Sequence, residues 1–130
     1  MTSLVRIDGV GKSFGDDVQA LREITATIEP GTITGLVGPD GAGKTTLIRL
    51  IAGLMMPTAG AISVFGLDTQ KDAADIQASI GYMPQRFGLY EDLKVRENLD
   101  LYAELRGLPP GERAAVFARL LEFTGLARFT

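Results

Sequence analysis

The apolar residues of this 130-residue chain change their spacing along the sequence, from strand-like in the first part to helical in the last. Partial alternation of apolar and polar residues predicts early strands, and a short apolar run of Ile33, Leu36 and Val37 that ends at Gly38 predicts a buried one. The strands are expected over residues 4–10, 18–28, 33–37, 61–65 and 79–83. The first two are expected to pair, because a short turn over residues 12–17 separates them.

Helices are predicted where apolar residues recur every three or four positions. The first runs from about Leu47 to Leu54, and a short one is expected over residues 72–79. Two more follow Val95, separated by a break at residues 107–111 that is rich in glycine and proline. Their predicted apolar faces are Val95, Leu99, Tyr102 and Leu105 on one helix and Val116, Leu120 and Phe123 on the other.

A glycine-rich loop lies between the predicted buried strand and the first helix. Gly38, Gly43, Lys44 and Thr45 fit the pattern G-x-x-x-x-G-K-[ST]. Backbone N–H groups of such a loop can point at phosphate oxygens, and the positive N-terminal end of the next helix attracts them. Lysine can reach the outer phosphates, and the threonine hydroxyl can ligate Mg²⁺. With a strand before it and a helix after it, the loop predicts a nucleoside triphosphate site.

Composition narrows the classes of protein to which the chain could belong. The chain is 45 % hydrophobic and 22 % charged with a net charge of −3, which is typical of a globular domain and does not favour nucleic-acid binding. It has no cysteine and no histidine, which excludes disulfides and imidazole chemistry within these residues. We find no apolar run of membrane-spanning length and no secretory signal, so a cytoplasmic protein is expected.

Four segments, in this order, resemble the ATP-binding domain of an ABC transporter: KSFGDDVQAL, GPDGAGKTT, AGLMMPTAGAISVFG and IGYMPQRFGLYEDLKVRENL. The second and fourth are most similar to ATP-binding subunits of ABC-2-type multidrug exporters. The resemblance implies an α/β fold of the P-loop NTPase class. It places an antiparallel β subdomain and part of the parallel core sheet in residues 1–94, and the start of a helical subdomain in residues 95–130.

The resemblance also implies a site for ATP and Mg²⁺. Phe14 matches the aromatic residue that stacks on adenine, and Gln85 matches the glutamine that reaches Mg²⁺ and the attacking water. Lys44 and Gln85 are the implied catalytic residues, and Thr45 and Gln85 the implied metal ligands. The implied nucleotide-binding residues are Phe14, Val18, Gly38, Pro39, Asp40, Gly41, Ala42, Gly43, Lys44, Thr45 and Thr46.

Two partners are implied by the same resemblance. One is the membrane subunit of an exporter, whose coupling helix would meet the segment Phe87, Gly88, Leu89, Tyr90 and Glu91. The other is a second ATP-binding domain in a head-to-tail dimer. The expected location is therefore the inner face of the cell membrane, as a peripheral subunit.

Two residues depart from the family's pattern. Asp40 stands where Asn or Ser is usual, and its carboxylate should repel the γ-phosphate unless it points away or is protonated. Lys94 replaces the Thr that usually precedes Val95, and lysine cannot cap a helix as threonine does.

Later motifs of the family have no counterpart in this chain: the LSGGQ-type motif, the strand ending in the metal-binding Asp and catalytic Glu, and the switch histidine. We therefore expect the C-terminal half of the domain to be absent and these residues to bind nucleotide at most. We also expect the fold of these residues to be marginal, oligomeric or strand-swapped. The alternatives are a soluble ABC ATPase acting in translation or DNA repair, a P-loop kinase or GTPase, and a non-catalytic nucleotide-binding fragment.

Overall fold

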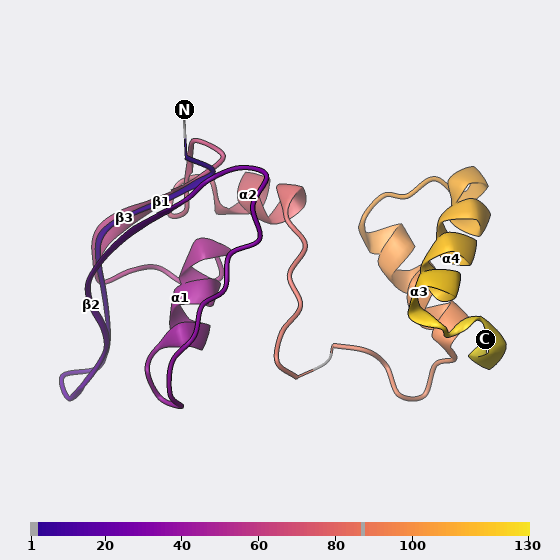
Figure 1. Ribbon diagram of the computed structural model, residues 1–130, viewed down its shortest axis with the longest axis horizontal. Coiled ribbons are helices and arrows are strands. Elements are labelled where there is room, and N and C mark those ends of the chain that lie inside the picture. Colours follow the sequence, from indigo (N-terminus) through magenta and orange to yellow (C-terminus); the bar gives the residue numbers. More distant parts are fainter. Residues whose placement is uncertain (1–2, 87) are drawn as a thin grey trace. The chain divides into compact units, whose positions relative to one another are not determined.

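The computed structural model describes residues 3–86 and 88–130 and divides the chain into two compact units, Met1–Tyr82 and Met83–Thr130 (Figure 1). Each unit has a hydrophobic core of its own. The first unit combines a sheet with two helices, and the second consists of helices and the loop that leads into them.

An antiparallel sheet forms the first unit, with the strand order β2-β1-β3-β4. The strands are β1 Val5–Phe14, β2 Val18–Ile28, β3 Ala59–Val64 and β4 Leu67–Asp68. The predicted pairing of the first two strands is confirmed, but β1 continues to Phe14, so the turn is shorter than expected. The strand predicted over residues 61–65 is confirmed as β3, and β4 was not predicted.

The core of the first unit lies between the sheet and two helices, α1 Lys44–Ile51 and α2 Ala73–Ser79. Figure 1 shows both helices on the same side of the curved sheet. The alternation along β1 buries Val5 and Ile7, and α1 contributes Leu47 and Leu50 to the same cluster. Both helices were predicted from the sequence and are confirmed.

Two predicted strands do not form. Residues 32–39 and 80–83 have no strand assignment, so the expected buried strand over 33–37 and the expected strand over 79–83 are both wrong. The side chains of Ile33 and Val37 are fully or almost fully exposed, at 105 % and 91 %. The physical reason is that a strand needs a partner for its N–H and C=O groups. Neither segment pairs with any strand in residues 3–86 and 88–130.

The second unit is built on α3 Val95–Leu105 and α4 Pro110–Thr124, followed by the 3₁₀ helix η1 Ala127–Phe129. Both long helices were predicted, but the buried face of α4 was not. Phe117 and Leu121 are buried, whereas Leu120 and Phe123 are 42 % and 87 % exposed. Large apolar residues occupy positions 116, 117, 120, 121 and 123, so the pattern alone allows more than one buried face, and packing selects between them.

Helix α3 begins without a cap from the Lys94 side chain. Instead, the carboxylate of Glu97 accepts a hydrogen bond of 2.7 Å from the backbone N–H of Lys94. This is one half of a capping box, in which the third helical residue bonds back to the N-cap. Glu97 thus partly compensates for the absence of a threonine cap at position 94.

Candidate nucleotide-binding site

The glycine-rich loop curls tightly before α1. Gly41 and Gly43 have φ angles of 78° and 97°, which side-chain-bearing residues rarely adopt. Within the loop, the N–H of Ala42 donates to Pro39 O at 3.2 Å. Helix α1 follows with Gly43 as its N-cap and without a side-chain cap. The first N–H groups of α1 are therefore oriented toward the loop with no side chain to satisfy them, which is how a helix end receives an anion.

Lys44 folds back over the loop. Its Nζ donates to the carbonyl oxygen of Gly38 and, at 2.7 Å, to that of Pro39. An ammonium carries three N–H groups, and these two bonds use two of them, so the third can donate to a phosphate oxygen. The expected role of Lys44 is thus compatible with its geometry, since the loop carbonyls hold the charge above the anion site.

The loop contacts the sheet at Gly43. A Cβ on this residue would lie 2.7 Å from Ala20 O and 2.8 Å from Leu21 Cδ2, closer than any side chain can approach. The pairing of β1 with β2 runs from Lys12↔Leu21 to Ser13↔Gln19, so Ala20 is the extra residue of a β-bulge. Glycine is needed at position 43 both for its φ and for this close packing on the bulge.

The bulge brings the loop close to the end of the β1–β2 hairpin. Phe14 and Val18 pair across the hairpin, and their side chains are 45 % and 56 % exposed. Val18 lies two residues from Ala20, about 7 Å along a strand. The structure therefore brings Phe14 and Val18, two of the predicted nucleotide-binding residues, to the same part of the first unit as the phosphate loop, residues 38–46.

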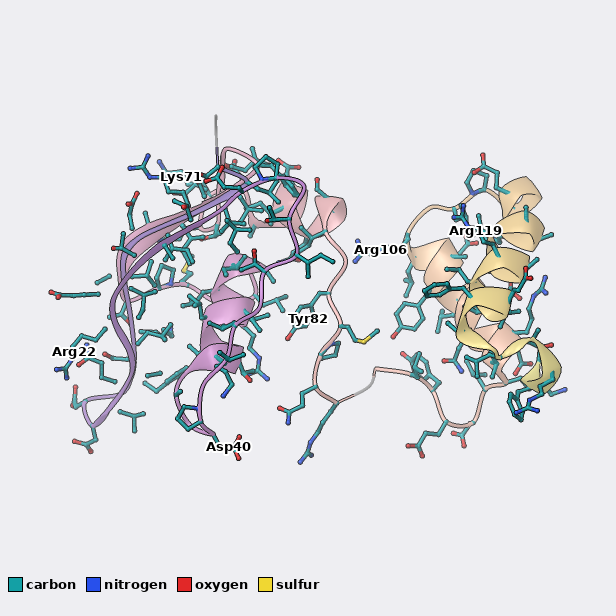
Figure 2. The ribbon with its side chains drawn as sticks, in the orientation of Figure 1. Arg22, Asp40, Lys71, Tyr82, Arg106 and Arg119 are labelled. Carbon is teal, nitrogen blue, oxygen red and sulfur yellow. The ribbon has the colours of Figure 1, made fainter. Side chains whose placement is uncertain are left out.

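Asp40 lies at the tip of the loop, where its side chain is exposed (Figure 2). Thr45 is exposed and Thr46 half-buried in the first turn of α1. No group of three or more acidic side chains converges among the described residues. The Thr45 hydroxyl thus fits a Mg²⁺ ion that is held mainly by phosphate oxygens and water, as magnesium usually is in nucleotide sites.

Gln85 belongs to the second unit, where it is exposed and lines a groove of about 840 Å³. The groove is also lined by Leu89 and Tyr90, from the segment predicted to meet a membrane subunit. Phe87, the first residue of that segment, lies outside the described residues.

This segment is held in place by Asn98, which the sequence pattern did not single out, and by Tyr102, which was predicted only as part of an apolar helix face. Asn98 is only 9 % exposed, and its side chain bonds to both N and O of Tyr90 at 3.0 Å. The same amide donates to Leu93 O and Lys94 O at 3.2 Å. The Tyr102 hydroxyl donates to Gly88 O at 2.5 Å. The sequence feature that could have identified Asn98 is an asparagine in the first turn of a predicted helix, next to the apolar face of that helix.

Fold and loop together define a protein of the phosphate-loop nucleotide-binding class. The sequence profile described as ABC transporter matches residues 21–130, and the chain belongs to this family. It is 52 % identical over 129 residues to the probable multidrug ABC transporter ATP-binding protein YbhF of Escherichia coli (strain K12), covering 98 % of this chain and 22 % of that protein. It is 38 % identical over 125 residues to the sulfate/thiosulfate import ATP-binding protein CysA of Gloeobacter violaceus, covering 96 % of this chain and 36 % of that protein.

Solved structures confirm the fold implied by the resemblance. An ATP-binding subunit of an ABC transporter matches with a TM-score of 0.83 at 31 % identity, over 98 % of this chain and 52 % of that chain. The ATP-binding cassette MJ0796, in a dimeric post-hydrolysis state bound to ADP and Pi, matches with a TM-score of 0.80 at 26 % identity, over 96 % of this chain and 59 % of that chain. The chain thus spans only part of the relatives it matches. None of the helices described here has the length and apolarity to cross a membrane.

Proposed function

We propose that this chain is part of the ATP-binding subunit of an ABC exporter, in which ATP binding and hydrolysis drive transport by a separate membrane subunit. The observation that carries the proposal is the arrangement of the first unit. The uncapped start of α1 and the ammonium of Lys44 lie at one loop, and Gly43 of that loop packs on β2 two residues from Val18. The identity to a probable multidrug ABC transporter ATP-binding protein supports the exporter class.

In the proposed site, the loop N–H groups and Lys44 hold the β- and γ-phosphates, and the Thr45 hydroxyl ligates Mg²⁺. When bound, the cation neutralises charge on the phosphates. Phe14 and Val18 offer their exposed apolar surface to the adenine base. Gln85 matches the family's glutamine, and its proposed role is to orient the attacking water and contact Mg²⁺.

The proposed contact with the membrane subunit is the segment Gly88–Glu91 and the groove beside it. Leu89 and Tyr90 are 52 % and 58 % exposed, although Asn98 and Tyr102 fix the backbone of their segment. A surface that is apolar and exposed but held in one conformation is suited to receive a helix. This contact would place the chain on the inner face of the membrane.

The proposed domain organisation keeps residues 1–94 as the β subdomain with part of the core, and residues 95–130 as the start of the helical subdomain. We also propose a head-to-tail dimer with a second ATP-binding domain. Support comes from the match to MJ0796, whose solved structure is described as dimeric.

Replacing Lys44 tests the nucleotide site. The variant Lys44→Ala removes a charge-assisted donor, worth about 1.5–3 kcal/mol, so its affinity for Mg-ATP should fall at least about tenfold by calorimetry. Lys71→Ala is the matched control, because Figure 2 shows Lys71 at the opposite end of the first unit from Asp40. The control should bind as the unsubstituted protein does. Equal affinity in Lys44→Ala and the unsubstituted protein would refute the proposed role.

A further inference from the structure

The end of β1 is fastened to the chain that leaves α1. The N–H of Thr58 donates to Gly11 O at 2.9 Å, and the Thr58 hydroxyl accepts from the N–H of Ser13 at 3.0 Å. Lys12 adds a third link, because its Nζ donates to Met56 O at 2.8 Å. The ammonium of Lys12 is thus held by a backbone carbonyl at a defined place on the sheet.

That place is next to the ring of Phe14. The Nζ of Lys12 lies 5.3 Å from the ring centroid, within the range of a cation–π contact. Lys12 is half-buried, whereas Phe14 is 45 % exposed. One face of the ring therefore has a fixed cation beside it, while much of the remaining ring surface is open to solvent.

We propose that Lys12 is a positioning residue for the nucleotide base. It holds the Phe14 ring with one face against the ammonium and the other face presented for stacking. The inference rests on the proposed role of Phe14 as the adenine platform. Two physical effects support it: a ring that is already immobilised loses less freedom when a base stacks on it, and a cation on one face makes the opposite face less negative.

The test compares a ligand that has a base with one that does not. Calorimetry on the protein would measure the affinity for Mg-ATP and for magnesium tripolyphosphate, which occupies only the phosphate loop. Lys12→Met should lower the affinity for Mg-ATP about two- to fivefold and leave that for tripolyphosphate unchanged. Lys12→Arg, which keeps a cation, should restore the affinity for Mg-ATP. In a Phe14→Ala background, Lys12→Met should have no further effect.

Each other outcome has a definite meaning. Unchanged Mg-ATP affinity in Lys12→Met, with a loss in Phe14→Ala, overturns the inference and leaves the proposed nucleotide site intact. No loss in Phe14→Ala overturns the adenine platform itself. An equal loss of affinity for both ligands in Lys12→Met would mean that Lys12 acts on the phosphates. Tighter binding of Mg-ATP by Lys12→Met would mean that the Lys12 ammonium occupies the ring face that the base needs. Either result overturns the inference. If Lys12→Met does not fold, Lys12→Gln keeps a donor to Met56 without the charge and should show the same selective loss.

Discussion

Asp40 places a carboxylate at the tip of a loop that we expect to hold a polyanion. Two like charges 4 Å apart repel by about 1 kcal/mol in water and more where water is excluded. Because the side chain is exposed, the repulsion should lie near the lower value. Asp40→Asn should therefore raise the affinity for Mg-ATP up to about fivefold at low salt, measured by calorimetry.

A salt titration distinguishes this repulsion from a change in loop structure. Repulsion between exposed charges is screened, so the gain in Asp40→Asn should shrink as ionic strength rises. Asp75→Asn, which makes the same charge change on α2, should leave the affinity unchanged. The same affinity in Asp40→Asn and the unsubstituted protein across neutral pH would contradict the repulsion.

The site residues divide according to how local their signal is. Gly38, Gly43 and Lys44 could be predicted because their pattern lies within seven consecutive residues. Lys12 could not, since its role depends on Met56, which is 44 residues away in the sequence. Asn98 could not either, because a buried amide is identified by its partners rather than by its neighbours in sequence.

Strand β3 depends on Gly60 to approach β1. Gly60 has a φ of 76°, and a Cβ there would lie 2.4 Å from the carbonyl oxygens of Asp8 and Gly9. The obstacle is the backbone of β1, which cannot move aside as a flexible side chain could. Gly60→Ala should therefore destabilise the protein by about 3 kcal/mol or more, measured by urea unfolding.

Gly66→Ala is a matched control for the backbone angle. Its φ of 77° is nearly the same, but a Cβ at Gly66 would meet nothing within 4 Å. Only the penalty for a left-handed residue applies there, about 1–2 kcal/mol. The difference in unfolding free energy between the two variants measures the destabilisation caused by the steric overlap at Gly60. Equal losses of stability in the two variants would show that Gly60 is not required for close packing.

Elements could be predicted from the sequence where their partners are close in the chain. The pair β1 and β2 shares one hairpin, so alternation and a turn were sufficient. The apolar run Ile33–Val37 was equally clear as a pattern, but it specifies only that a strand is possible. Whether it forms depends on neighbours, and none of the described strands lies beside it. Periodicity reports which residues favour burial and cannot report what buries them.

For the molecule as a whole, the resemblance predicted more than periodicity could. It placed the chain in a fold class that the solved structures confirm. It did not predict that residues 32–39 would be exposed and without a strand assignment, because in the family this segment was expected inside a parallel sheet. The first unit therefore has one hydrogen-bonded sheet and one exposed segment, residues 32–39, that carries apolar side chains and has no strand partner among the described residues.

That segment should make the protein self-associate. A segment that has no strand partner and exposes apolar side chains can form a strand with the same segment of another copy. Ile33 and Val37 are four residues apart, so they would share one face of the strand formed by this pairing. Apparent mass should rise with protein concentration in light scattering, and Ile33→Thr with Val37→Thr should reduce that rise. The control Ile33→Val with Val37→Ile keeps the apolar surface and should not reduce the rise in apparent mass. If the unsubstituted protein stayed a monomer at all concentrations, this segment would not drive self-association.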